Sequence, residues 1–394
     1  MGFLSGRVSF DRFRVESPDV QKLSEKHVEL LNRFGIAQAG EPSLGETLVG
    51  FTGGGHLLDS KFDLEKNVFG DVLCCGIRID TTKVPAALRK AWLQMESEAL
   101  TADGPRRRLT KAERQQVNEA VEQRAKDEAG DGRFRRMQHV SVLWDVGQRF
   151  LYLGGGGPVA TGQCLDLLSR AFKLSLEWLT AGRLANEWCL VNNRSASWEA
   201  LAPAVFHGEA SGAIAWVSDL SVNFDFLGNE FLLWLWWHLE AESDTVALAD
   251  GSEVVGMLNR TLSLECPEAL SGKETITAES PVRLPEAMHA IGAGKLPRKS
   301  GLVLARQDYQ HDLVIQAETF SVSGAKCQLS SSEDAEKTTG QEQRIDALRH
   351  LVETLDLLFA AFCQRRFGKS WKREVEEIRR WLQKKAGPPK RSAA

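Results

Sequence analysis

The spacing of apolar residues predicts amphipathic helices in several parts of the chain. In "SPDVQKLSEKHVELLNRFG" (17–35), apolar residues return every three to five positions, and a glycine provides a stop. In "VPAALRKAWLQMESEAL" (84–100), Pro85 suits a first helical turn, and Trp92 and Met95 share one face. The longest stripe covers five turns and comprises Ile345, Leu348, Val352, Leu355, Phe359 and Phe362.

Alternating or continuous apolar runs predict strands between these helices. One hairpin is expected in "HVSVLWDVGQRFLYLGGGG" (139–157), and a second in "DTVALADGSEVVGMLNRTLSLE" (244–265), where Asp250-Gly251 makes the turn. Single strands are expected in "RVSFDRFRV", "ETLVGFTGGGH", "DVLCCGIRID", "SGLVLARQD" and "HDLVIQAETFSV". Hairpins mixed with helices in this way predict an α+β fold with antiparallel sheets and long helices.

One predicted helix offers little apolar surface. Thr110 and Glu113 have the spacing of a capping box, which predicts the start of the helix "KAERQQVNEAVEQRAKDEAG". Its large apolar residues are Val117 and Val121 alone, so the helix has little to bury. We therefore expect residues 101–137 to project from the body as a finger.

The remaining patterns suggest a division of the chain. The expected segments are a central α+β domain (1–100 and 138–200), the finger (101–137), a second α+β region (201–328), a linker (329–343), and C-terminal helices with a basic tail (344–394).

An aromatic helix, "NEFLLWLWWHLE", offers a choice of roles. Trp234, Trp236 and Trp237 could stack on unpaired bases or sit at a membrane interface. Leucines fill the rest of the helix circumference, however, and this favours a helix that is buried on most sides.

Charge is distributed unevenly along the 394 residues. The whole chain carries a net charge of −4, yet basic residues outnumber acidic ones in 104–136 and again in 364–394. Such asymmetry suggests a polyanionic partner for the basic parts. A charge run by itself more often marks a solvated face.

The basic residues of the finger are the candidate DNA contacts. Arginine and lysine neutralise phosphates and release counterions whatever the base sequence. Because no base-reading motif accompanies them, the residues alone indicate non-specific nucleic-acid binding. The candidates are Arg106, Arg107, Arg108, Lys111 and Arg114 at the expected root of the finger, and Arg133, Arg135 and Arg136 near its expected end.

Motifs for catalysis are not evident. The glycine clusters "FTGGGH" and "GGGG" lack the Lys-Ser/Thr of a phosphate-binding loop, and the histidines and acids show no metal-ligand spacing. No GxSxG nucleophile elbow is present. We therefore expect a protein that is not an enzyme and that needs no cofactor or metal.

The seven scattered cysteines favour a reducing, cytoplasmic compartment. The sequence shows no signal peptide and no apolar run of membrane-spanning length, so no membrane association is expected.

An ordered set of segments resembles the recombination-associated RdgC protein family. "VGFTGGGH", "VLCCGIRIDTTKVPAALRKAWLQ" and "LTKAERQQVNEAV" are similar to successive family segments, and "RFRR" precedes "VSVLWDVGQRFLYLGGG" as an Arg-aromatic tip precedes a hairpin in the family. "ADGSEVVGMLNRTL" and the 345–362 stripe are similar to later segments. This chain is longer than typical members, and "DGRFRR" stands where the family has Pro-Arg-Ala-Phe.

The resemblance implies a horseshoe-shaped subunit that closes into a ring-shaped homodimer. The ring would encircle double-stranded DNA without reading its sequence, and single-stranded DNA is a further possible ligand. Phe134 would anchor the dimer at the tip, and the protein would be nucleoid-associated and restrain RecA-dependent recombination. Two alternatives stay open: a DNA exonuclease, which would need several acidic side chains converging in a cleft, and a protein-interaction factor whose basic patches bind acidic partners.

Overall fold

The computed structural model of this chain describes most of the sequence. The described residues are 2–17, 22–101, 109–207, 214, 216, 223–267, 272–329 and 340–386. Arg106, Arg107 and Arg108 lie outside the described residues, as do most of the predicted linker and the last eight residues of the basic tail.

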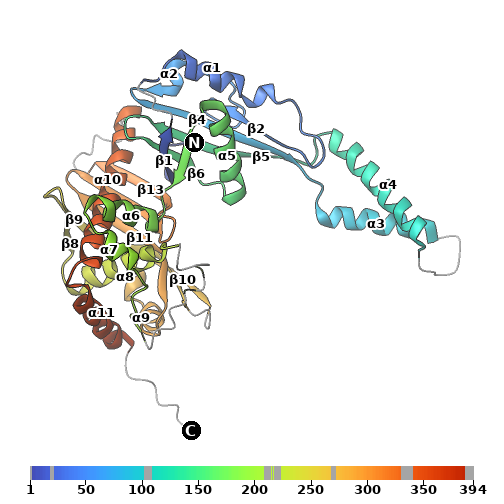
Figure 1. Cartoon of the computed structure of the whole chain (residues 1–394). Helices are drawn as coiled ribbons and strands as arrows, with labels where there is room; N and C mark the ends of the chain where they lie inside the picture. Colours follow the sequence, from blue (N-terminus) through green and yellow to red (C-terminus); the bar gives the residue numbers. More distant parts are fainter. Residues whose placement is uncertain are drawn as a thin grey trace, which may run out of the picture. The chain divides into compact units, whose positions relative to one another are not determined.

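The described strands form a 13-stranded antiparallel sheet, and eleven α-helices accompany them in this part of the chain (Figure 1). The predicted α+β class with antiparallel strands is therefore confirmed. The chain folds as two compact units, which are described separately: unit 1 comprises Met1–Gly2, Val15–Arg149 and Gly156–Leu176, and unit 2 comprises Phe3–Arg14, Phe150–Gly155 and Glu177–Ala394.

Unit 1 is built around the strand order β5-β4-β2. β4 is buried along nearly all its length because it lies between two neighbours, which explains its continuous apolar sequence. The rings of Trp144, Phe172 and Phe51 pack together in its core. The elements of unit 1 are α1 (Glu25–Arg33), η1 (Ile36–Gln38), β2 (Thr47–Thr52), α2 (Leu64–Asn67), β3 (Val68–Phe69), β4 (Val72–Thr82), α3 (Ala86–Thr101), α4 (Lys111–Gly130), β5 (Arg135–Asp145) and α5 (Pro158–Phe172).

Two helices of unit 1, α3 and α4, form a hairpin that extends away from the strands of this unit (Figure 1). The capping box at the start of α4 is confirmed, since the Thr110 N–H donates to Glu113 Oε2 at 2.8 Å and the Glu113 N–H donates to Thr110 Oγ1 at 3.4 Å. The finger expected at residues 101–137 contains α4 but leaves out its partner α3. α4 buries Val117, Val121, Ala125 and Ala129, and α3 supplies the buried Trp92.

Unit 2 has the strand order β10-β9-β11-β12-β13-β1-β6, and the short strands β7 and β8 pair with β1 and β9. β1 lies between strands that are distant in sequence, because Val8 pairs with Ala325 and Phe10 pairs with both Val322 and Gly154. The strands of this unit are β1 (Val8–Ser17), β6 (Phe150–Gly154), β7 (Ser175–Trp178), β8 (Thr245–Ala247), β9 (Glu253–Glu265), β10 (Lys273–Ala278), β11 (Leu296–Arg306), β12 (Tyr309–Gln316) and β13 (Val322–Leu329).

Helices cover one face of the unit 2 sheet. α8 packs on β11 and β9, and α10 packs on β12 and β13. The helices and turns of this unit are α6 (Ala181–Val191), α7 (Ser195–Glu199), α8 (Phe226–Ala241), η2 (Pro281–Arg283), α9 (Pro285–Gly292), α10 (Gln341–Arg366) and α11 (Trp371–Ala386).

The aromatic helix α8 is a core helix, as predicted. Trp234, Trp236 and Trp237 are at most 3% exposed. The apolar stripe of α10 is likewise buried from Ile345 to Phe362. In the part of the chain that the structure describes, no helix has both the length and the apolar character to cross a membrane.

Candidate nucleic-acid interface

The face of the unit 2 sheet opposite α8 and α10 is open to solvent. Side chains alternate along β11, so that Leu302 and Leu304 point to the helices while Val303 points away. On β9 the outward Val255 and Met257 are 47% and 54% exposed. We call this surface the open sheet face and define it by Arg7, Val255, Met257, Arg260, Lys299, Val303, Asp312, Val314 and Lys326.

Among the residues that define the open sheet face, four cations outnumber one acid, and the exposed Glu253 adds a second acid on the same side of β9. Asp312 is its central acid and pairs with Arg260 at 3.0 Å and with Arg7 at 3.5 Å. Both guanidinium groups stay about half exposed, at 55% and 48%. Lys299 and Lys326 are also exposed, and among the described residues no ion pair is seen for either. The acid therefore fixes the direction of two arginines, and the face keeps an excess of positive charge.

A β-bulge explains how Arg260 reaches this position. The pairing of β9 with β11 shifts register between Ser300 and Leu302, and Arg260 has a φ of 61°. Opposite the bulge lies Gly301, where an added Cβ would collide with the carbonyl oxygen of Asn259. The glycine therefore permits the bulge, and the bulge turns Arg260 towards Asp312.

The cations are spread across neighbouring strands. Arg260 on β9 and Lys326 on β13 are separated by three strand-to-strand steps, which is about 14 Å. Duplex DNA carries about one negative charge per 1.7 Å of its axis, so a surface of this width is as wide as the spacing of several phosphates. The aliphatic side chains between the cations offer no hydrogen bonds to base edges.

The hairpin places Lys111 and Arg114 at its far end. Both side chains are exposed in the first turns of α4, beside the undescribed residues 102–108. They line a groove of about 530 Å³ whose other walls include Glu119 and an ion pair between Arg89 and Glu122. Acidic and basic groups are therefore mixed along this groove.

Residues 133–136 lie at the opposite end of the hairpin from the one expected. They return the chain into β5, where Arg135 and Arg136 pair with Thr82 and Thr81 of β4. The order of root and tip is thus reversed relative to the sequence-based expectation, because the far end of the hairpin holds the end of α3 and the start of α4. Arg133 is 65% exposed and lies 3.8 Å from Glu128, and Arg136 is exposed.

Arg135 stabilises the sheet. Its Nη2 lies 2.8 Å from Oδ2 of Asp80, a fully buried carboxylate that Arg78 also holds through two hydrogen bonds of 2.9 and 2.6 Å. Burial by itself raises the pKa of Asp80, but the hydrogen bonds from Arg78 and Arg135 outweigh it and lower the pKa below its usual value. Arg135 therefore has a structural role, because its guanidinium is bound to the buried carboxylate of Asp80.

Phe134 packs on the hairpin to which it belongs. Its ring contacts Trp92 edge-on with a centroid distance of 6.4 Å, and it lies against the buried cluster of Val84, Trp92, Val121 and Ala125. The side chain is partly exposed. Contact between Phe134 and a second copy of the chain stays a prediction.

The loop "FTGGGH" encloses a carboxylate of the protein itself. Asp59 accepts hydrogen bonds from the N–H of Gly55 at 3.0 Å and of Lys61 at 3.3 Å, and Lys66 Nζ lies 2.7 Å from it. An added Cβ at Gly53 would collide with Asp59 and with the Lys61 carbonyl oxygen. The glycines are therefore needed for close approach of the loop to Asp59.

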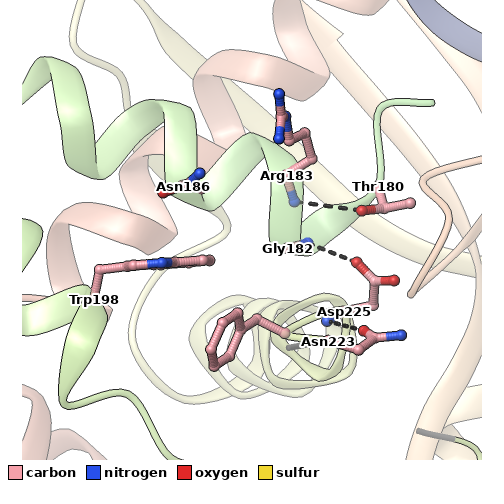
Figure 2. Close-up of a pocket in the computed structure, with 8 residues that line it drawn as sticks. Thr180, Gly182, Arg183, Asn186, Trp198, Asn223 and Asp225 are labelled. Carbon is pink, nitrogen blue, oxygen red and sulfur yellow. Dashed lines mark hydrogen bonds between the residues drawn. The ribbon is translucent and has the colours of Figure 1, made fainter. Parts of the chain in front are cut away.

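A hollow of about 440 Å³ lies between α6, α7 and the start of α8 (Figure 2). Its polar groups bond to one another: the N–H of Gly182 donates to Asp225 at 3.0 Å, and that of Arg183 donates to Thr180 at 3.3 Å. Burial raises the pKa of Asp225. Trp198 forms another wall. Asp225 and Thr180 together cap α6, which gives the carboxylate a structural role.

Two histidines join α10 to β12. Nε2 of His311 lies 2.9 Å from Nδ1 of His350, and the ring of Tyr309 stacks on His350 with a centroid distance of 4.2 Å. His311 is fully buried, and burial lowers its pKa to about 3, with His350 and Arg306 adding to the effect.

The chain matches no protein-family model. A search of curated proteins also finds no match. Among the described residues, no three His, Cys, Asp or Glu side chains gather in a way that could hold a metal ion.

Proposed function

We propose that this chain is a non-specific DNA-binding protein that contacts duplex DNA through the open sheet face. The observation that carries the proposal is the set of exposed cations on neighbouring strands, with Arg260 and Arg7 held in place by Asp312. Such a surface attracts a phosphate backbone whatever the base sequence. Lys111, Arg114, Arg133 and Arg136 on the hairpin add exposed positive charge.

The resemblance to the RdgC family extends this proposal. By that analogy the DNA-bound form is a ring-shaped homodimer built from horseshoe-shaped subunits, which encloses the duplex and restrains RecA-promoted recombination. A nucleoid-associated, cytoplasmic protein without catalytic turnover fits the same analogy. The exonuclease alternative receives no support from the described residues, where no group of three His, Cys, Asp or Glu side chains could hold a metal ion.

Salt dependence of DNA binding tests the interface. The variant Arg260→Gln/Lys299→Gln/Lys326→Gln removes three cations from the open sheet face. Because each phosphate contact adds about 0.9 to the slope of log affinity against log salt, we expect the slope to fall by roughly 2 to 3. The control Lys26→Gln/Lys61→Gln/Lys83→Gln removes the same charge from exposed sites in unit 1 and should leave the slope nearly unchanged.

Several outcomes would overturn the proposal. Wild-type binding that is indifferent to salt between about 50 and 200 mM, or strong preference for one sequence, contradicts a phosphate-based interface. If the salt slope falls equally in the two triple variants, then net charge, and not the open sheet face, governs DNA binding. Sedimentation at micromolar concentration tests the homodimer separately, and degradation of labelled duplex with Mg²⁺ that disappears on mutating one acidic residue would contradict the absence of turnover.

A further inference from the structure

The last helix carries a second cationic surface. α11 turns Trp371, Ile378, Trp381 and Leu382 inward, and each is at most 8% exposed. With its apolar side buried, the helix presents its charged side to solvent. The exposed cations are Lys369, just before the helix, and Lys372, Arg373, Arg380 and Lys384 within it; we call this set the α11 basic face.

Acidic residues neutralise part of the α11 basic face, because Glu376 is exposed one helical turn from both Lys372 and Arg380. Glu374 is buried, and its carboxylate lies 3.2 Å from Arg365 and 3.0 Å from Ser370. Its charge therefore does not offset the exposed cations. Glu377 lies 3.6 Å from Arg373 across one helical turn. Among the described residues no ion pair is seen for Lys372, Arg380 or Lys384.

The wider sequence strengthens this asymmetry. Residues 364–394 contain eleven Lys and Arg but three Glu, in a chain whose net charge is −4. The positive charge is therefore gathered on this end of the chain while the remainder is strongly acidic. Lys384 follows Lys372 by twelve positions, which corresponds to about 18 Å of helix and is long enough to follow several phosphates.

The α11 basic face and the open sheet face lie on opposite sides of unit 2. α11 packs on α8 and α9, while α8 packs on β11 and β9 with Leu239 against Gly256. The open sheet face is formed by the residues of these strands that point away from α8. A single duplex lying on one surface therefore leaves the other available.

We propose that the α11 basic face binds the phosphate backbone of a second duplex, so that one molecule bridges two DNA segments. The first contact in this scheme rests on the proposed function of the open sheet face. Charge complementarity selects the occupant, since the face offers several cations along about 18 Å and no exposed apolar anchor of the kind that protein interfaces use.

A bridging assay tests the inference. Unlabelled duplex is tethered to beads, the full-length protein is added, and fluorescent duplex is then supplied in solution at low salt. We expect the wild type to recruit fluorescent duplex to the beads. The variant Lys372→Gln/Arg380→Gln/Lys384→Gln should recruit at least fivefold less, while the amount of protein retained by the tethered duplex changes less than twofold. Lys26→Gln/Lys61→Gln/Lys83→Gln is the matched control and should bridge like the wild type.

The assay separates failure of this inference from failure of the proposed function. Wild-type protein that is not retained by the tethered duplex overturns both. Retention without recruitment overturns bridging alone. Recruitment that is equal in the α11 variant and the wild type shows that other surfaces, including a second open sheet face in a dimer, hold the second duplex. Binding of labelled poly-glutamate that needs Lys372, Arg380 and Lys384, without recruitment of duplex, assigns the face to an acidic protein instead.

Discussion

The guanidinium of Arg12 donates two hydrogen bonds of 2.6 Å each to the carboxylate of Asp356, although the two residues are 344 positions apart in sequence. The contact fixes α10 on β1 within unit 2. Arg12 is 5% exposed, so its charge has little access to water and depends on this partner.

Loss of either partner should destabilise unit 2. Because Asp356→Ala leaves the buried Arg12 uncompensated, we expect the free energy of unfolding to fall by about 3 kcal/mol, measured by urea denaturation. Arg373→Ala breaks an exposed i,i+4 pair in the same unit and should cost less than about 0.5 kcal/mol. Equal effects of the two substitutions would contradict the assigned role of the Arg12–Asp356 pair.

The environment of Asp59 predicts that the stability of the fold depends on pH in the acidic range. Burial raises the pKa of Asp59, but hydrogen bonds from Lys66, Gly55 and Lys61 lower it below the usual value overall. Since the folded pKa is depressed, this carboxylate stabilises the fold above the unfolded pKa near 4, and the contribution is lost as pH falls through the folded value. Asp59→Asn should therefore destabilise the protein at pH 7, and its effect should shrink as the pH falls below about 4. A difference that is the same at both pH values would exclude this mechanism.

The histidine pair predicts a second pH dependence, at milder acidity. His311 has a folded pKa of about 3, and burial also lowers the pKa of His350; Arg306, Glu353 and Tyr309 surround the pair. A histidine with a depressed pKa stabilises the fold fully above the unfolded pKa near 6.5, and the stabilisation declines below it as the unfolded chain takes up protons.

We expect the free energy of unfolding to fall by up to about 1.4 kcal/mol per pH unit for each such histidine between pH 6.5 and 5. His311→Gln should flatten this slope. His289 is exposed in the same unit, so His289→Gln is the control and should leave the slope unchanged. An unaltered slope in His311→Gln would show that other groups carry the dependence.

Phe134 gives a test of the hairpin. Its packing on Trp92 and the adjoining cluster predicts that Phe134→Ala destabilises the hairpin by about 2 kcal/mol, less than for a fully buried ring because the side chain is partly exposed. Hydrogen exchange of the α4 amides should report the loss. If α4 protection is unchanged while dimerisation weakens, Phe134 serves the contact between copies and not the packing of the hairpin.

Local patterns were sufficient to predict many elements. The capping box at Thr110 and the buried stripe of α10 follow from residues within a few turns of each other, and both are confirmed. Beyond β11, one predicted strand is in fact parts of β12 and β13, because the chain turns at Phe320, which has a φ of 52°. A positive φ at a phenylalanine depends on tertiary packing and has no local sequence signal.

The remaining features depend on contacts between residues that are distant in sequence, and sequence patterns could not predict them. The pairing of α3 with α4 was missed because α4 has few large apolar residues, and Leu88 and Leu93 of α3 reach the cluster around Val121 only in the folded hairpin. The open sheet face was missed because its cations, Arg7, Arg260, Lys299 and Lys326, are isolated in sequence and meet only through strand pairing. The isolated Gly301 within a strand pattern was the available hint of the bulge.

The pairing of β1 with β13 can form only late in synthesis. β1 emerges first, yet its partners Val322 and Ala325, and the helix bearing Asp356, are made more than 300 residues later. At about 5 to 20 residues per second, the ribosome takes roughly 15 to 70 s to supply them. Most residues of unit 1 are complete well before then. Until synthesis passes α10, Arg12 lacks Asp356 and one edge of β1 lacks β13, although β6 can already pair with the other edge. The unpaired edge is open to pairing with other strands during this interval.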